Sequence, residues 1–168
     1  MPRAGVRVTD RELYEGFALQ SVDDKGRVAI PADLRNAAER NSDVRQVVVG
    51  MSEIDPCLTA YDLAWSKELH ARLERIERLA IDRGETVDLR AKRRAFGQVE
   101  KAPFDGSGRF VLPVFFRQKA KIGRWAFFSG AGDTFDIWAP EQLMQAPDVD
   151  PFLREMCEFL CQQKGVAL

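Results

Sequence analysis

Short apolar segments separated by turn residues occupy most of the chain, and they follow the same order twice. Residues 17–61 and 99–138 each contain a strand, a turn, a strand, a short helix and two further strands. Alternating or short continuous apolar runs of this kind predict half-buried or buried β-strands. These runs lie at residues 17–22, 28–30, 47–49, 58–61, 99–104, 110–112, 125–128 and 135–138. The pattern therefore indicates two similar halves rich in β-strands.

Helical spacing of apolar residues occurs between the two halves and again near the end of the chain. The longest predicted helix begins near Asp62 and ends before Gly84, and a second one follows at about residues 88–95. We expect this pair to be a spacer between the halves, and we expect residues 151–163 to form another amphipathic helix. The apolar stripes consist of Trp65, Leu69, Leu73, Ile76 and Ala80 in the longest helix, and of Phe152, Met156, Phe159 and Leu160 in the last one.

One motif occurs twice, at Asp23–Pro31 and Asp105–Pro113, with its arginines 82 positions apart. Each copy has an Asp, two variable residues, Gly-Arg, three apolar residues and Pro, and a further Arg stands four positions later. An internal repeat of this kind indicates a duplicated structural unit. A half of about 45 residues buries too little apolar area to fold alone. We therefore expect the halves to share one pseudo-twofold β-barrel, which would also remove exposed strand edges.

Each motif predicts a hairpin tip that presents an arginine. Asp and Gly suit the tight turn, because Asp bonds to nearby backbone and Gly adopts positive φ. Arg27 and Arg109 would follow these tips, and a guanidinium makes fork contacts with phosphate or with guanine. The Asp four residues earlier would hold the guanidinium in one orientation and lower the entropy lost on binding. The motif alone leaves two alternatives open: a pair that merely stabilises the turn, and a polyanion other than DNA.

Composition and charge narrow the class of protein. The chain has 168 residues, of which 45% are hydrophobic and 30% charged, as in a folded globular protein. The net charge of −1 does not favour nucleic acid, but residues 67–101 carry +3 and residues 133–168 carry −5. No apolar run approaches the roughly 18 residues of a membrane span. Residues 1–15 have no apolar core of a secretory signal, so we expect a cytoplasmic protein.

Few residues suit catalysis or metal binding. His70 is the only histidine, and its place in a predicted helix favours a surface position. No G-x-S-x-G, P-loop or C-x-x-C motif is present. Cys157 and Cys161 are one helical turn apart and are expected to be small buried apolar residues. We expect no catalytic residue, metal, cofactor or small-molecule substrate.

The sequence resembles the MraZ family of bacterial regulators, which contain two AbrB/SpoVT-type swapped-hairpin modules. The resemblance covers about residues 17–143. It implies an α+β fold in which modules at residues 17–64 and 99–142 form one pseudo-twofold β-barrel, with a helical spacer at 65–98 and a C-terminal amphipathic helix at 151–164. It rests on the two Asp-x-x-Gly-Arg motifs, on Val28–Pro31 with Arg35, on Cys57–Tyr61 leading to Trp65, on Arg93–Gly97 and on Phe135–Trp138.

The resemblance also implies a function. It implies a sequence-specific DNA-binding transcription regulator, usually a repressor, which acts on the promoter of its own cluster of division and cell-wall genes. Members of the family form ring oligomers and bind short G-rich direct repeats, so double-stranded DNA and further copies of the chain are the expected partners, at the nucleoid. The expected DNA site is Asp23, Lys25, Arg27, Asp105 and Arg109, with Arg27 as the principal contact.

Two further expectations concern the second tip and the end of the chain. Ser107 stands where the first tip has Lys25, so we expect the second tip to contribute less to DNA affinity. AbrB-type modules also occur in antitoxins, where an acidic disordered tail blocks a toxin. The acidic end of this chain leaves an antitoxin-like or protein-interaction module as the alternative function.

Overall fold

The computed structural model describes residues 10–168 as a mixed α+β fold. Residues 1–9, on which most of the expectation about a secretory signal rests, lie outside the described part. The first half contains β1 Phe17–Ser21, β2 Arg27–Ala29, α1 Ala32–Asn41, β3 Gln46–Met51 and β4 Leu58–Asp62; the middle contains α2 Leu63–Asp82 and α3 Ala91–Gly97; the second half contains β5 Val99–Pro103, β6 Arg109–Val111, α4 Val114–Lys119, β7 Trp125–Gly130 and β8 Phe135–Trp138; the chain ends with α5 Pro140–Gln145 and α6 Pro151–Gln163.

The eight strands form two separate antiparallel sheets within the described residues. Six strands lie in the order β1-β7-β8-β4-β3-β5, and β2 pairs only with β6. The sequence correctly predicted the α+β class and the position of each strand. The hydrogen bonds do not close into the expected barrel, because β1 and β5 end the larger sheet and β2 and β6 do not join them. Strands of only three residues, as β2 and β6 are, provide too few backbone bonds to bridge both sheet edges.

Strand pairing between the halves replaces the hairpin that we expected within each half. β1 pairs with β7 from Phe17 opposite Ser129 to Ser21 opposite Trp125, and β3 pairs with β5. β2 pairs with β6, and neither β1 nor β5 pairs with the strand that follows its own tip. The prediction of a local hairpin was therefore wrong, although the turn at its tip is present. Pairing across the halves combines their apolar faces, which neither half can bury alone.

The core combines apolar residues from both halves. Ile30 and Leu34 of the first half and Leu112 and Phe128 of the second belong to one cluster of buried side chains. A second cluster connects α5 and α6 to the sheet through Leu19, Phe127, Trp138, Leu143, Cys157 and Cys161. Both helical cysteines are fully buried, as expected. The halves therefore share the largest of the buried clusters.

The last helix packs on the sheet through the face that carries its two cysteines. Cys157 and Cys161 face the core, whereas Phe152 and Phe159 are 63% and 56% exposed. Small cysteine side chains let α6 approach the sheet closely, which two phenylalanines would prevent.

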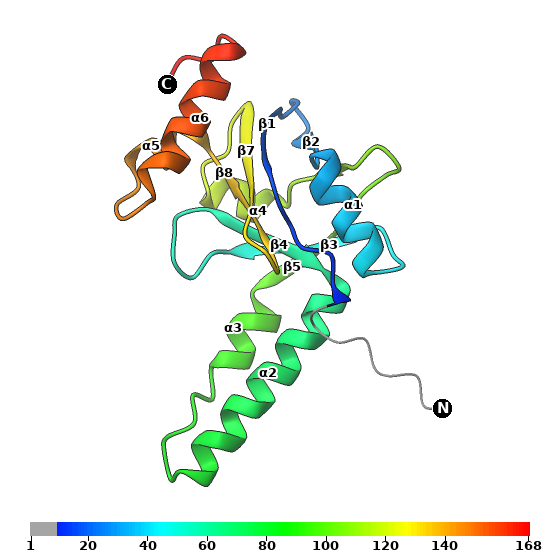
Figure 1. The fold of residues 1–168 in the computed structure, drawn as a ribbon, viewed down its shortest axis with the longest axis vertical. Coiled ribbons are helices and arrows are strands. Elements are labelled where there is room, and N and C mark those ends of the chain that lie inside the picture. Colours follow the sequence, from blue (N-terminus) through cyan, green and yellow to red (C-terminus); the bar gives the residue numbers. More distant parts are fainter. Residues whose placement is uncertain (1–9) are drawn as a thin grey trace.

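The helices α2 and α3 extend from one end of the molecule, at the opposite end from α6 (Figure 1). Trp65 is the only buried residue of α2, and Ile76 is 62% exposed. The long helix was predicted correctly, but most of its apolar stripe does not reach the core of the single chain. His70 is exposed, as expected. Across residues 10–168, every helix is too short or too polar to span a lipid bilayer.

Candidate nucleic-acid interface

The first tip is a tight turn organised by the carboxylate of Asp23. The backbone N–H groups of Lys25 and Arg27 both donate to Asp23 Oδ1 at 2.9 Å. The Nε–H of Arg27 donates to Asp23 Oδ2 at 2.7 Å, so one carboxylate fixes both the turn and the guanidinium. Gly26 has φ +79°, a conformation that favours glycine. The turn thus holds an exposed arginine in a defined orientation.

The second tip repeats this turn with a looser arginine. The backbone N–H groups of Ser107 and Arg109 donate to Asp105 Oδ1 at 2.9 Å, and Gly108 has φ +82°. The Nε of Arg109 lies 3.7 Å from Asp105 Oδ2, which is an ion pair beyond hydrogen-bond length. The backbone of the repeat is therefore conserved between the halves of this chain, while the arginine is tightly held only at the first tip.

Hydrogen bonds cross between the two tips. The N–H of Leu112 donates to the carbonyl of Gly26, and the N–H of Ile30 donates to that of Gly108, both at 2.9 Å. Each tip is thus fixed by the strand that follows the other tip. Because both contacts are equivalent, the pair of tips has approximate twofold symmetry.

The β2–β6 ribbon places both motif arginines on one face. Arg27 lies opposite Val111, and Ala29 lies opposite Arg109. Residues directly opposite in an antiparallel pair point to the same face, so both arginines point away from the core. Arg27 and Arg109 are diagonal neighbours in this register, a relation that places residues roughly 7–8 Å apart. Both also line one shallow hollow beside Asp105. The structure therefore brings the five expected residues into one exposed region.

Two further arginines support the tips from the opposite halves. A Cβ on Gly26 would lie 2.8 Å from Nη1 of Arg117, and one on Gly108 would lie 2.9 Å from Cδ of Arg35. Arg35 and Arg117 belong to the repeated motif, but they are not among the residues that we expected in the DNA site. Lys121 lines a second hollow with Lys25 and Arg117 and was missed entirely. The repeat indicated that both arginines belong to the duplicated unit, whereas Lys121 is part of no motif.

Hydrogen bonding keeps both tip carboxylates in the charged form. The backbone N–H of Arg27 lowers the pKa of Asp23, and the Arg27 side chain lowers it further. The backbone N–H of Arg109 likewise lowers the pKa of Asp105. Ionised carboxylates accept hydrogen bonds at all their lone pairs. The turn geometry therefore persists throughout the neutral pH range.

Replacement of Gly108 by alanine is expected to lower the free energy of unfolding by about 2–3 kcal/mol. The new Cβ would lie 3.1 Å from the Ile30 carbonyl as well as 2.9 Å from Arg35, in addition to the strain of positive φ. Gly84→Ala is the matched control, because Gly84 also has positive φ but no neighbour within 4 Å of such a Cβ. Urea unfolding should show a clearly smaller loss for Gly84→Ala. Equal losses would contradict close packing at the crossed tips.

The described residues offer no group for metal binding. Within residues 10–168, no three His, Cys, Asp or Glu side chains gather closely enough to share an ion. The arrangement of charged groups at the tips instead suits an extended polyanion, because two exposed guanidinium groups line one open hollow.

Fold and site together define an α+β protein in which two similar halves present paired arginine tips on one face. The chain belongs to the MraZ family. The family model described as "MraZ protein, putative antitoxin-like" matches residues 13–83. The transcriptional regulator MraZ of Pseudomonas aeruginosa PAO1 is 32% identical over 126 residues, which are 75% of this chain and 80% of that protein. The transcriptional regulators MraZ of Pseudomonas putida F1 and Pseudomonas entomophila L48 are 29% identical over the same coverage.

Family membership confirms two expectations from the sequence. The resemblance to MraZ is confirmed by these relatives. The expectation that the protein is not an enzyme is also confirmed, because the relatives are transcriptional regulators.

Proposed function

We propose that the protein is a sequence-specific DNA-binding regulator of transcription that uses the paired tips as its DNA contact. It would repress its own cluster of division and cell-wall genes in the cytoplasm, at the nucleoid. Its operator would consist of short G-rich direct repeats. The supporting observation is the pair of crossed turns, which present Arg27 and Arg109 on one exposed face. The relatives named as transcriptional regulators support the same function.

The chemistry of the site fits a G-rich duplex. Guanine presents the acceptors O6 and N7 in the major groove, and an arginine fork contacts both. The Nε of Arg27 is already bonded to Asp23, which leaves the terminal guanidinium nitrogens for the DNA. Lys25, Arg35 and Arg117 surround the tips and would contact phosphates. Each region of the site therefore has a role in either base recognition or positioning.

A ring oligomer follows from the weakness of one site. A few phosphate contacts give low affinity at physiological salt, because released counterions provide most of the binding free energy. Several copies in one ring raise the effective concentration of each tip at the neighbouring repeat. We therefore propose that direct repeats are bound by adjacent subunits of a ring.

We also propose the domain division that the sequence suggested. Modules at residues 17–64 and 99–142 would form one swapped-hairpin unit, separated by the spacer at 65–98 and followed by the helix at 151–164. The support is the pairing of β1, β2 and β3 with β7, β6 and β5. In this arrangement, each DNA-contacting tip depends on residues from both modules.

The antitoxin alternative requires a free acidic tail. Residues 151–163 instead form a helix whose cysteines are buried in the second apolar cluster. A pull-down from lysate with and without nuclease separates the two functions. A stoichiometric protein partner that stays bound after nuclease treatment would favour the antitoxin. A DNA-binding regulator should instead release the co-purified proteins when the DNA is digested.

Selection of bound duplexes from a random pool tests the proposed function. We expect enrichment of short G-rich motifs that recur at a fixed spacing. A fragment carrying the enriched repeats should bind much more tightly than a scrambled fragment of equal length and composition. Heparin should compete with both fragments. It should displace the protein from the scrambled fragment at a lower concentration than from the repeat fragment. A pool without any enriched motif, or equal binding to both fragments, would contradict sequence-specific recognition.

A further inference from the structure

The end of helix α4 has a lysine at a position where glycine is usual. The N–H of Lys121 donates to the carbonyl of Gln118 at 3.1 Å. The next N–H, that of Ile122, donates to the carbonyl of Arg117 at 3.0 Å. This pair of hydrogen bonds is the Schellman motif, in which the residue after the helix adopts a left-handed conformation. Lys121 has φ +59°, a conformation that costs free energy for any residue with a Cβ.

Two other helices of this chain end in the same motif with glycine. Gly84 after α2 and Gly165 after α6 both have φ +67°, and each makes the same pair of bonds together with the residue that follows it. A basic residue near a helix end interacts favourably with the helix dipole. In α2 and α6 this residue stands one position before the glycine, as Arg83 and Lys164. Helix capping alone therefore does not explain Lys121.

Lys121 lines a hollow whose charged side chains are all basic. The hollow has a volume of about 390 Å³, and Lys25 and Arg117 are the other charged residues of its lining. Within the described part of the chain, neither lysine has a salt-bridge partner. Asp23 and Asp24 precede Lys25 in the first tip, but neither lines the hollow. An anion in the hollow would therefore meet three cations, one from the first half and two from the second.

Hydrogen bonds fix the position of Arg117 in this hollow. Its Nε donates to the carbonyl of Ile122 at 3.1 Å, and its Nη2 donates to that of Gly123 at 3.2 Å. Its Nη1 approaches the first tip, because a Cβ on Gly26 would lie 2.8 Å from this atom. The guanidinium therefore connects the first tip to the loop that begins with Lys121. Both cations are thus held beside the tip.

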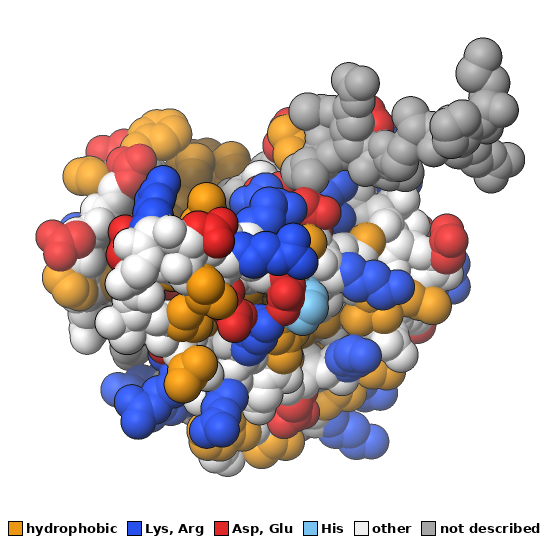
Figure 2. All heavy atoms as spheres, turned by 90° about the horizontal axis from the view of Figure 1, so that it is seen from below, with side chains coloured by type: hydrophobic (Ala, Val, Ile, Leu, Met, Phe, Trp, Pro, Cys, Tyr) orange, Lys and Arg blue, Asp and Glu red, His pale blue; other side chains and the backbone are white. Residues whose placement is uncertain are grey.

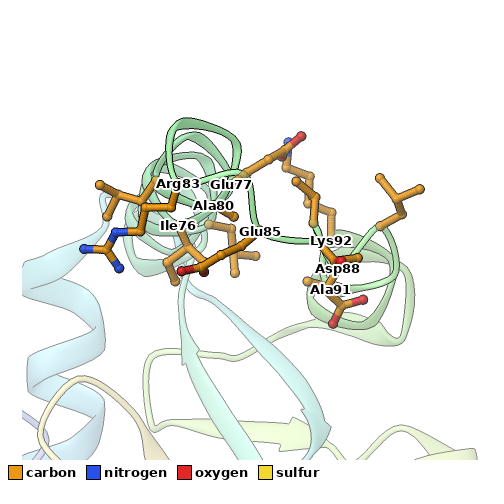
Figure 3. A pocket seen from close by; sticks show the side chains of 13 residues that line it. Ile76, Glu77, Ala80, Arg83, Glu85, Asp88, Ala91 and Lys92 are labelled. Carbon is orange, nitrogen blue, oxygen red and sulfur yellow. The ribbon is translucent and has the colours of Figure 1, made fainter.

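The cavity between α2 and α3 has a different charge pattern. It has a volume of about 460 Å³, and Figure 3 shows carboxylates and cations together in its lining: Glu77, Glu85, Asp88, Arg83 and Lys92. Figure 2 views this end of the molecule and shows Asp and Glu side chains among those of Lys and Arg. An anion would meet like charges in this cavity. The hollow beside the first tip is therefore better suited to an anion.

The matching positions beside the second tip carry less positive charge. At the offset of the repeat, Ser107 corresponds to Lys25 and Glu39 corresponds to Lys121. Glu39 lies within α1, and its carboxylate pairs with Nε of Arg45 at 3.5 Å. Of the two tips, the first therefore has the stronger positive charge beside it.

We propose that the hollow of Lys25, Arg117 and Lys121 binds one phosphate of the DNA backbone. This inference rests on the proposed function and adds Lys121 to its DNA contacts. Backbone strain of this kind is retained at functional sites, where the side chain serves a ligand. A phosphate contact fixes the position of a protein on the duplex without reading the sequence. The hollow would thereby hold the first tip in place while Arg27 contacts the bases.

Replacement of Lys121 by glycine should change stability and DNA binding in opposite directions. Glycine relieves the left-handed strain, so the midpoint of urea unfolding should rise above that of wild type. Loss of one phosphate contact should weaken binding to the repeat fragment and to the scrambled fragment alike, by about 3–10-fold. The slope of log affinity against log salt should fall by about 0.9 for each bound copy. Fluorescence anisotropy over a series of salt concentrations measures both quantities.

Two further variants serve as controls. Lys121→Arg keeps the cation and the left-handed strain, so it should retain DNA affinity close to that of wild type. Lys119→Ala removes an exposed lysine of the same helix that does not line the hollow, and it should leave affinity and salt slope nearly unchanged. Equal losses in Lys119→Ala and Lys121→Gly would show that net charge determines the affinity, and would overturn the proposal.

The remaining outcomes separate the hollow from the regulator function. Unchanged affinity and salt slope in Lys121→Gly would overturn the phosphate contact and leave the proposed function intact. A loss confined to the repeat fragment would also overturn it, because a phosphate contact does not depend on sequence. Wild type that binds both fragments equally would reject sequence-specific regulation. A weaker Lys121→Gly would still support the hollow in that case.

Free inorganic phosphate is the other source of the same anion. It can be added at constant ionic strength during urea unfolding of wild type and of Lys121→Gly. We expect the DNA affinity of the variant to be lower than that of wild type with or without this addition. If phosphate raised the urea midpoint of wild type alone and the variant bound DNA normally, the hollow would belong to the free ion and the DNA contact would be overturned.

Discussion

Replacement of Arg27 by alanine is expected to abolish specific DNA binding while leaving the oligomer intact. A well-placed arginine fork contributes about 1–3 kcal/mol of discrimination between base pairs. Several subunits of a ring would lose this contact together, so the affinity for a repeat-containing promoter should fall by about 100-fold or more. Fluorescence anisotropy with a labelled promoter fragment, beside light scattering, would measure both quantities. Unchanged DNA affinity would contradict the proposed interface.

Two matched variants separate charge from geometry at the first tip. Arg27→Lys keeps the positive charge but loses the planar fork, so it should retain binding to scrambled DNA and lose the preference for repeats. Arg109→Ala should weaken binding less than Arg27→Ala, because the Arg109 side chain is not hydrogen-bonded to its Asp105. Equal losses for the two alanine variants would show that the tips contribute equally.

The sequence predicted the elements well because their signals are local. The turn at Asp23 and the strand that contains Val28 follow from alternation and from turn residues within a few positions. Strand partners depend on how two halves combine their apolar faces, which no local pattern records. The pairing of Phe17 with Ser129 therefore became visible only in the structure. The same limit explains why a local hairpin and a closed barrel were expected.

Helix faces were harder to predict than helix positions. The last helix has two adjacent apolar faces, one with Phe152 and Phe159 and one with Cys157 and Cys161. Hydrophobic size alone favours the phenylalanine face for burial. The structure packs the cysteine face, because small side chains allow a close approach to the sheet. The two phenylalanines are left exposed as a result.

The candidate site was predicted in outline by the repeat. It marked Asp23 and Arg27, and it also marked Arg35 without revealing that this side chain packs against the other tip at Gly108. That contact joins two segments more than 70 positions apart and arises only when the halves cross. A repeat therefore identifies which residues recur, but the packing of the halves decides what each residue contacts.

A buried ion pair near α2 had no signal in the sequence. Asp62 is fully buried and accepts two hydrogen bonds from the guanidinium of Arg11, at 3.1 and 2.7 Å. Tyr14 Oη donates to the same carboxylate at 2.7 Å, and the N–H of Trp65 does so at 2.8 Å as the helix cap. Burial raises the pKa of Asp62, but the bonds from Arg11, Tyr14 and Trp65 outweigh it and hold the pKa below its usual value. This carboxylate therefore connects the segment before β1 to the start of α2.

Asp62→Asn is expected to lower the free energy of unfolding by about 3–5 kcal/mol at pH 7, because Arg11 would remain buried without a counter-charge. Asparagine keeps the size and the capping ability of aspartate, so the variant isolates the charge. A depressed folded-state pKa stabilises the protein above the unfolded value of about 4, and this stability is lost as the pH falls through the folded value. The difference in free energy of unfolding between wild type and variant, measured with urea, should therefore become smaller in acid.

Asp136→Asn provides a control with the opposite sign. Burial, with the nearby charge of Asp55, raises the pKa of Asp136 to about 6. Ionisation of this group opposes folding above that pH, so its replacement should stabilise the protein by about 1–3 kcal/mol at pH 7. The gain should disappear below about pH 4, where the carboxyl is protonated in both states. The free energy of unfolding should fall in Asp62→Asn and rise in Asp136→Asn. These opposite changes would identify the ion pair with Arg11, and not burial alone, as the reason that Asp62 stabilises the start of α2. A pH-independent loss for Asp62→Asn would contradict this assignment.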